Sequence, residues 1–409
     1  MKGLLKVALG VMTAIGGFVD IGNIVTSGVT GARFGMTLAW AVVLGTLIMV
    51  LYGEMAGRVA AVAQRAVFDV VRERLGVRFA LVNLVASALL ALLTLAAEIG
   101  GVALVLQLVS GVHYLIWVPV VGLAVWLAIW RLPFSVLETV FGLLGLCLLV
   151  FAAALALLPA DWHQFAEEVF SPSVPAGEPL PTWLFYGISL IGACVVPYQV
   201  VFFASGGREE KWTVRDMRRA RVNTLVGFPL GAVLSLAIMA AMVPVLRPDS
   251  VDVHHLGQVT LPIAQALGVA GLLLTFVGFF ACTFAAAAES ALSIGYSFGQ
   301  YFGWSWGKRH RPVDAPRFHL VCLASVIAAT AFVLTTIDPI TVTIVSVVLG
   351  GAAIPLTYLP LLVVANDREY LGRYVNKRWQ NALAMLALLV MVVVSVAALP
   401  LLIATKAGQ

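Results

Sequence analysis

Two polar side chains stand close together in a stretch that is otherwise apolar enough to cross a membrane. The stretch GGFVDIGNIVTSG, residues 16–28, contains Asp20 and Asn23. An isolated carboxylate in the hydrocarbon of a bilayer is costly, so its presence there points to function. Carboxylate and amide oxygens are ligands that hard divalent cations prefer. The pair predicts a cation site inside the membrane; the alternative for Asp20, which is compatible with that role, is a helix cap.

A second apolar segment carries a comparable interruption. The segment ISLIGACVVPYQVVFF, residues 188–203, has Pro197 near its middle, and we expect Gly22 to open the first segment in the same way. Pro has no N–H, so it frees a carbonyl one turn earlier, near Ala193. Breaks of this kind survive in lipid only where they line a cavity. We therefore expect a site between the two breaks, to which Gly17 and Ala193 contribute backbone carbonyls.

Further polar residues are candidates for the surroundings of this site or for a pathway to it. Tyr198 and Gln199 follow the proline directly, although a core aromatic is an equally open interpretation of the tyrosine. Glu98 and Glu289 are charges within apolar segments, which makes them functional candidates. We expect Glu98 to pair with a basic residue such as Arg58. Neither interrupted stretch contains Lys or Arg, which makes an anion a poor substrate.

The rest of the chain must hold these residues within a membrane. Of the 409 residues, 61% are hydrophobic and 11% are charged, whereas a soluble domain has about 25% charged residues. Apolar segments are predicted at residues 7–30, 37–58, 80–110, 114–130, 134–158, 183–205, 222–245, 264–297, 318–336, 340–364 and 380–404. Their lengths predict an all-α polytopic membrane protein with a single transmembrane domain over residues 1–409.

The basic residues predict an orientation. With the N-terminus inside, all but three of the 25 Lys and Arg residues fall on the cytoplasmic side, the exceptions being Arg33, Arg247 and Lys406. The positive-inside rule therefore places the chain in a cytoplasmic (inner) membrane with its C-terminus outside and its first helix retained. The net charge of +5 follows from these loops and requires no nucleic acid. The expected partners are a divalent metal ion and the lipid bilayer, with no cofactor, and the expected state is a monomer.

The number of segments suggests an internal repeat. Residues 7–158 and 183–364 would each form five helices, and because five is odd the two halves would have opposite orientations. The segment at 380–404 would be an eleventh helix. The interrupted segments are the first of each half, so the two breaks occupy equivalent positions.

The sequence offers little support for catalysis. It has no HExxH motif and no paired carboxylates or Ser/His set in an apolar segment, so we expect that the protein is not an enzyme. The cysteines form no CxxC pair and are expected to be small buried residues. They are Cys147, Cys194, Cys282 and Cys322.

The two interrupted stretches and three further segments resemble one known family, the natural resistance-associated macrophage protein (Nramp) family. DIGN at 20–23 resembles its Asp-Pro-Gly-Asn, and IGACVVPYQ at 191–199 resembles its Gly-Ala-x-Val-Met-Pro-His-Asn. Helix-3, helix-8 and helix-10 segments of the family resemble residues 95–106, 297–304 and 346–362. The resemblance implies a leucine-transporter (APC superfamily) fold, a 5+5 inverted repeat plus an eleventh helix, and divalent metal transport by alternating access.

The resemblance also implies roles and shows departures. It makes metal ligands of the two polar side chains and two carbonyls named above. The family's methionine falls on Val196 and its histidine on Tyr198, while its helix-10 glutamine falls on Val347 beside Gly350 and Gly351. A thioether favours manganese or iron over magnesium. Without it, we expect a wide site with no soft donor that prefers magnesium, with manganese second, similar to the Nramp-related magnesium transporters.

Proton coupling is expected to be weak or absent. Where the family carries acidic residues in helix 3, this chain is apolar near Ala88 and Leu95, and a proton relay needs titratable groups. Three alternatives remain open. They are a proton-coupled manganese or iron transporter of the ordinary Nramp type, a sodium-coupled amino-acid transporter of the same fold, and a metal sensor without transport.

Overall fold

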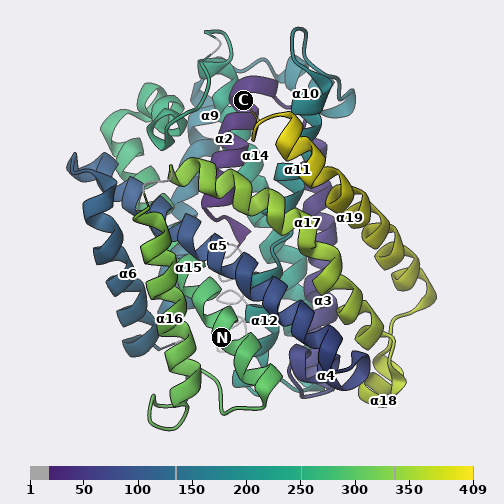
Figure 1. Cartoon of the computed structure of the whole chain (residues 1–409). Coiled ribbons are helices and arrows are strands. Elements are labelled where there is room, and N and C mark those ends of the chain that lie inside the picture. Colours follow the sequence, from purple (N-terminus) through teal and green to yellow (C-terminus); the bar gives the residue numbers. More distant parts are fainter. Residues whose placement is uncertain (1–17, 134–135, 250, 336–337, 409) are drawn as a thin grey trace.

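Figure 1 shows a computed structural model of the chain, which describes residues 18–133, 136–249, 251–335 and 338–408. All regular structure in these ranges is helical. Residues 21–157 form α2 (Ile21–Phe34), α3 (Ala39–Val62), α5 (Val77–Ser110), α6 (Tyr114–Arg131) and a fifth segment built from η1 (Leu137–Phe141), α8 (Gly142–Gly145), η2 (Leu146–Leu149) and α9 (Val150–Leu157). Residues 180–365 form α11 (Leu180–Cys194), α12 (Pro197–Glu209), α13 (Met217–Val222), η4 (Asn223–Gly227), α14 (Phe228–Leu246), η5 (Leu256–Thr260), α15 (Leu261–Phe302), α16 (Pro316–Val333) and α17 (Pro339–Ala365), and α19 (Arg378–Ala404) follows them.

These helices agree with the predicted membrane segments. Within the described ranges, ten helical segments are long and apolar enough to cross a membrane. The first predicted span, 7–30, lies partly outside the described residues. Its described part contains most of α2, which continues to Phe34. The sequence prediction missed the short helices in the connections, because their mixed polarity hides them among loop residues. They are α4 (Val67–Leu75), α10 (Trp162–Phe170), η3 (Val214–Asp216), α18 (Arg368–Leu371) and η6 (Gly372–Tyr374).

The interrupted helices lie at the centre of the bundle. The segment formed by α11 and α12 is almost wholly buried, whereas α19 is mostly exposed along one flank. Between these extremes, α5 packs along α15 and also contacts α17. Figure 1 shows α5 and α17 crossing in front of the central helices, with α6 and α16 at one side and α19 at the other. The core helices therefore enclose both breaks.

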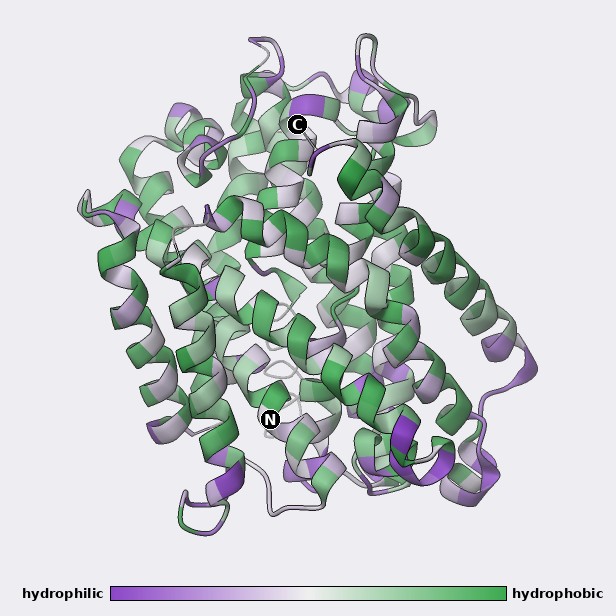
Figure 2. Ribbon diagram, viewed as in Figure 1, coloured by the Kyte–Doolittle hydropathy of each residue, from purple (hydrophilic) through white to green (hydrophobic). Residues whose placement is uncertain are grey.

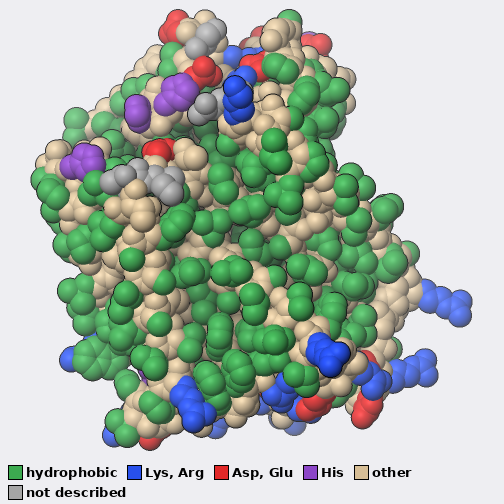
Figure 3. All heavy atoms as spheres, in the orientation of Figure 1, with side chains coloured by type: hydrophobic (Ala, Val, Ile, Leu, Met, Phe, Trp, Pro, Cys, Tyr) green, Lys and Arg blue, Asp and Glu red, His purple; other side chains and the backbone are tan. Residues whose placement is uncertain are grey.

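The surface is that of a membrane protein. Figure 2 shows hydrophobic residues over the middle of the molecule and hydrophilic residues gathered at its two ends. In Figure 3 most of the visible Lys and Arg side chains lie at the end that carries α4 and α18. At the opposite end, near α10, two arginines are paired with carboxylates: Arg33 Nε lies 2.8 Å from Glu178 and Arg247 lies 2.5 Å from Glu168. The two ends therefore differ in charge, and which end faces the cytoplasm stays a prediction.

Backbone contacts between helices depend on glycine at α2. A Cβ atom at Gly31 would lie 2.1 Å from the carbonyl oxygen of Met239 in α14. A backbone oxygen has no rotamer by which to move away, so these two helices pack at this distance only when residue 31 is glycine. Such close approach through small residues is common between helices in membranes.

We expect Gly31→Ala to lower the unfolding temperature of the detergent-solubilised protein. Forcing a methyl group against α14 costs about 1–3 kcal/mol by the usual penalty for overpacking. The matched control is Gly350→Ala in α17, where nothing lies within 4 Å of the added atom. The control is expected to be as stable as the wild type or more stable, because Ala is the better helix former by about 1 kcal/mol. Equal unfolding temperatures for Gly31→Ala and the wild type would contradict the α2–α14 contact.

Candidate functional site

Two helices are broken next to each other. In the first, Val19 and Asp20 are not helical and α2 begins at Ile21. In the second, α11 ends at Cys194 and α12 begins at Pro197, which is the first-turn position that proline favours. The prediction that Gly22 opens the first helix was therefore wrong. Gly22 lies in the first turn of α2.

Gly22 has a different role, which is to admit neighbouring atoms. A Cβ atom there would lie 2.6 Å from Cγ1 of Val347 and 3.0 Å from Oδ1 of Asp20. Glycine thus lets α17 and the Asp20 carboxylate approach the start of α2. The break itself occurs before the glycine because Asp20 adopts an extended backbone conformation, with φ −109° and ψ −177°.

Two buried carboxylates accept hydrogen bonds from the start of α2. Asp20 caps the helix, since its Oδ1 accepts from the backbone N–H of Asn23 at 2.9 Å. The carboxylate of Glu98 in α5 accepts from the N–H of Ile21 at 3.3 and 3.4 Å. Together they satisfy N–H groups that have no partner within the helix.

The prediction that Glu98 pairs with Arg58 was wrong. Arg58 lies 3.1 Å from Glu54, four residues earlier on α3, and its NH1 group donates to the carbonyl of Tyr374. The spacing of four residues between Glu54 and Arg58 on one helix favoured the local pair over Glu98, and that local pair is the one that forms.

The Asn23 side chain joins the two breaks. Its Nδ2 donates to the carbonyl of Phe18, at 2.6 Å, and to the carbonyl of Ala193, at 2.8 Å. Its Oδ1 accepts from the hydroxyl of Ser235 at 3.2 Å and from the thiol of Cys194 at 3.8 Å. Donors on one side and acceptors on the other set the orientation of the amide. One side chain therefore bridges the start of α2 and the end of α11.

The structure brings three of the four predicted ligands together. Asp20 and Asn23 share the first break, and the carbonyl of Ala193 lies against the Asn23 amide. Gly17 lies outside the described residues. The Asn23 oxygen faces away from the Ala193 carbonyl, so an oxygen cage around a cation would require the amide to turn over. The Cys194 thiol donates to the Asn23 oxygen at 3.8 Å and does not line the cavity beside Asp20, so the expectation of a site without a soft donor stays a prediction.

A small cavity lies beside the Asp20 carboxylate. Its walls include Val196 and Tyr198 at the second break and Val347 in α17. The volume open to the centre of a water molecule is about 20 Å³. That is room for about one water molecule. The wide pocket expected from Val347 is absent here because that side chain packs toward Gly22. Both described hydrogen bonds of the carboxylate are made to Oδ1.

Buried polar atoms without partners lie close to the second break. Among the described residues, the hydroxyl of Tyr198 and Oε1 of Gln199 have no hydrogen-bond partner. Tyr198 lines the cavity, whereas Gln199 does not. In lipid an unpaired polar atom is costly. These groups are therefore available to a bound ion or to water.

Sequence reasoning missed three neutral polar groups in the cavity wall. Thr94 in α5 and Ser346 in α17 line it, and their hydroxyls lie 3.1 Å apart. Ser87, seven residues before Thr94 and therefore on the same helical face, lines it as well. That spacing was the available signal, but single Ser and Thr residues are common in membrane helices.

The third buried carboxylate, Glu289, lies in α15. It and Asp20 both act electrostatically on Glu98. None of the ion pairs among the described residues includes Asp20 or Glu98. The same residues contain no group of three or more His, Cys, Asp or Glu side chains arranged to hold a metal. A cation here would thus rely on carbonyl, amide and water oxygens besides the carboxylate.

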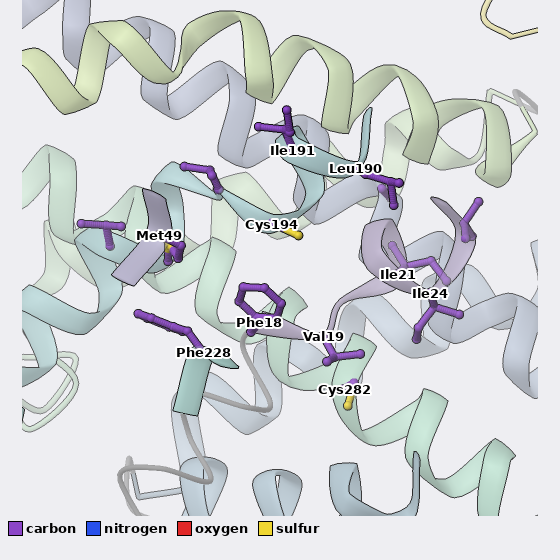
Figure 4. Close-up of a cluster of buried hydrophobic side chains, with 14 of the residues drawn as sticks. Phe18, Val19, Ile21, Ile24, Met49, Leu190, Ile191, Cys194, Phe228 and Cys282 are labelled. Atoms are coloured by element: carbon purple, nitrogen blue, oxygen red, sulfur yellow. The ribbon is translucent and has the colours of Figure 1, made fainter. Parts of the chain in front are cut away.

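Figure 4 shows the apolar surroundings of the first break. The extended stretch through Phe18 and Val19 leads into the helix that carries Ile21, and Cys194 and Cys282 lie near it on different elements. The ring of Phe18 contacts that of Phe228 in α14, with centroids 6.1 Å apart. Water is therefore excluded from one side of the break, which strengthens electrostatic interactions there.

Comparison with known proteins identifies the family. The natural resistance-associated macrophage protein-like (Nramp) family matches residues 10–400. The chain belongs to this family. A relative from Pectobacterium carotovorum subsp. carotovorum, the divalent metal cation transporter MntH, is 26% identical over 384 residues, which are 92% of this chain and 89% of that protein.

Solved structures show the fold of this Nramp chain. The Eremococcus coleocola manganese transporter has a TM-score of 0.70 at 20% identity, covering 95% of this chain and 85% of that one. A Na⁺-coupled sialic acid symporter has a TM-score of 0.62 at 15% identity, covering 96% and 89%. The predicted fold class, an all-helical transporter of the leucine-transporter type, is confirmed.

The contact between Glu98 and α2 predicts different outcomes for two substitutions. Glu98→Gln keeps an acceptor for the Ile21 N–H, so we expect an unfolding temperature close to that of the wild type. Glu98→Leu leaves that N–H buried without an acceptor and is expected to cost about 1–3 kcal/mol. Thermal unfolding in detergent compares the two. If Gln and Leu lowered stability equally, the hydrogen bond would not be the contribution that Glu98 makes.

Proposed function

We propose that this Nramp chain transports divalent metal cations across the membrane by alternating access. The observation that carries the proposal is the buried Asp20 carboxylate at the junction of two broken helices, next to the Ala193 carbonyl and without a described ion-pair partner. Its relatives are named as divalent metal cation transporters and manganese transporters. Those names describe transporters and not enzymes.

Electrostatics favours a cation at this junction. Asp20, Glu98 and Glu289 are all buried, with at most 7% of each residue exposed. A carboxylate in a medium of low polarity requires a proton or a nearby positive charge. The end of α11 also presents carbonyl groups, the negative end of a helix, toward the same place. A divalent cation held by Asp20 and Ala193 would supply the positive charge that both the buried carboxylate and the carbonyl end of α11 favour.

The Asn23 amide supplies the link between binding and movement. Without a cation, its NH₂ group donates to the two carbonyls and so takes the place of positive charge. Turning the amide over presents Oδ1 to a cation, at the cost of the hydrogen bonds from Ser235 and Cys194. Metal binding would then replace the bridge between α2 and α11 by a metal-mediated one. A ligand shifts a conformational equilibrium only through such differential contacts.

Magnesium is the proposed preferred substrate, with manganese second. Val196, which lines the cavity, offers no sulfur where the family resemblance places a methionine. The one thiol nearby, Cys194, donates to the Asn23 oxygen instead of lining the cavity. The remaining donors are oxygens, the ligands magnesium takes. Because magnesium keeps several of its waters, the cavity must open beyond its present size during transport.

Coupling to protons is proposed to be weak or absent. The α5 residues that line the cavity, including Ser87 and Thr94, do not titrate. An inside-negative potential would drive import, since two charges crossing 100 mV contribute about 4.6 kcal/mol. This direction assumes that the basic end of the molecule is cytoplasmic and that the two halves form the inverted repeat.

A proton-coupled manganese transporter is the second candidate. The buried carboxylates of Glu98 and Glu289 favour it, because titratable groups next to a cation site are able to carry protons. Their position beside α2 and within α15 places them near Asp20. The two candidates differ in whether pH changes with metal entry.

Removing the carboxylate tests the proposal directly. Wild type and Asp20→Ala are reconstituted in proteoliposomes that contain a magnesium-sensitive dye and a pH-sensitive dye. We expect magnesium entry without acidification in the wild type and at least about a tenfold lower rate in Asp20→Ala, because a main ligand is gone. Asp161→Ala, an exposed carboxylate that caps α10, is the matched control and should transport normally. Manganese entry with acidification and no magnesium entry would favour the second candidate.

The metal preference rests on Val196. Val196→Met places a thioether at the cavity, so we expect the ratio of manganese to magnesium uptake to rise by about tenfold or more, since soft donors favour manganese over magnesium. Val196→Leu is the control for added bulk and should not shift the ratio. Competition between the two metals in the same liposomes measures it. An equal shift in both variants would assign the effect to size and not to sulfur.

A further inference from the structure

A groove opens at the basic end of the molecule, away from the candidate metal site. It lies between α3, η4 and the beginning of α19, and its volume is about 430 Å³. In Figure 1, α19 rises along the flank of the bundle from the region of α18. Because α19 packs mainly along α17 and touches α3 only weakly, its lower part leaves this groove uncovered.

Positive charge dominates the groove. Four basic residues line it, Arg58, Arg221, Arg373 and Lys377, against the single carboxylate of Glu54. Glu54 is shared, since it lies 3.1 Å from Arg58 and 2.9 Å from Arg221. No ion pair among the described residues includes Arg373 or Lys377. The groove therefore holds an excess of positive charge that suits an anion.

Arg58 adds a donor that the protein leaves unused. The residue is 4% exposed and lines the groove, and its Nε has no hydrogen-bond partner among the described residues. An unpaired buried N–H costs about 1–3 kcal/mol. Other atoms cover this Nε, so a phosphate oxygen in the groove reaches it only after the Arg58 side chain shifts. Arginine binds phosphate well through its several N–H groups.

The other walls of the groove are apolar and aromatic side chains. Val50, Leu51 and Leu225 line the groove, and Leu225 is 58% exposed. Trp379, which is 59% exposed, and Tyr374 lie at the same level. Trp and Tyr with one apolar and one polar side favour the boundary between membrane and water. Apolar walls, boundary aromatics and cations in one groove match the kinds of groups in a phospholipid.

We propose that this groove binds an anionic phospholipid of the cytoplasmic leaflet, with the phosphate against Arg58, Arg373 and Lys377. Its acyl chains would follow Leu51 and Leu225 into the bilayer. Basic pockets between membrane helices on the cytoplasmic side have this chemistry, and the leaflet they face is negatively charged. The bound lipid would fill the gap between α3 and α19 and hold the start of α19 in place.

Native mass spectrometry of the full chain tests this site. Detergent-solubilised protein is titrated with phosphatidylglycerol and, separately, with phosphatidylcholine, and bound lipid is counted. The variant Arg373→Gln/Lys377→Gln removes two exposed cations that hold no described ion pair. It loses a hydrogen bond and a ring contact between Arg373 and the adjacent Tyr374 at the surface, so it should fold normally. Each is worth about fivefold in affinity for an anionic lipid, so we expect phosphatidylglycerol to bind about 25-fold more weakly, with phosphatidylcholine unchanged.

Controls separate this site from general surface attraction and from free phosphate. Arg309→Gln/Arg311→Gln removes two exposed cations of the loop before α16, which do not line the groove, and should bind phosphatidylglycerol like the wild type. Millimolar inorganic phosphate should not displace the lipid, because it lacks acyl chains. Equal weakening in both double variants, equal binding of the two lipids, or displacement by phosphate would each overturn the proposal.

Discussion

The structure depends on how backbone groups are satisfied where two helices stop inside a membrane. Each break leaves N–H and carbonyl groups that lipid cannot hydrogen-bond. Asp20 and Glu98 accept from the start of α2, and Asn23 donates to the carbonyls of Phe18 and Ala193. These contacts hold the two breaks against each other. The burial of the surrounding helices follows, because an open side would admit lipid to unpaired backbone.

The groups that satisfy the breaks are also those that a cation would use. In the structure, the Asn23 amide donates to the Ala193 carbonyl, and one oxygen of Asp20 accepts the hydrogen bond that caps α2. A cation must therefore compete with hydrogen bonds that stabilise the closed junction. This competition gives a physical reason for a site that changes shape when it fills.

The periphery follows a different principle. At the ends of the helices, charge and interfacial aromatics take over from hydrogen bonding within the core, as at the groove between α3 and α19. The paired arginines near α10 and the partly unpaired cations near α18 give the two ends different electrostatic character. A membrane with a negatively charged inner surface distinguishes between such ends.

The sequence by itself determined the helical class, most of the spans and the two interrupted helices, and it predicted a site at Asp20 and Asn23. These are local properties, visible in runs of apolar residues and in polar groups that lipid would not tolerate. Only the tertiary structure decided which partners those groups have. In the structure, Glu98 accepts from the Ile21 N–H and does not pair with Arg58. The Asn23 amide donates to two carbonyls, and the first break lies before Gly22 and not at it. Such contacts join residues far apart in the chain, so no local pattern specifies them.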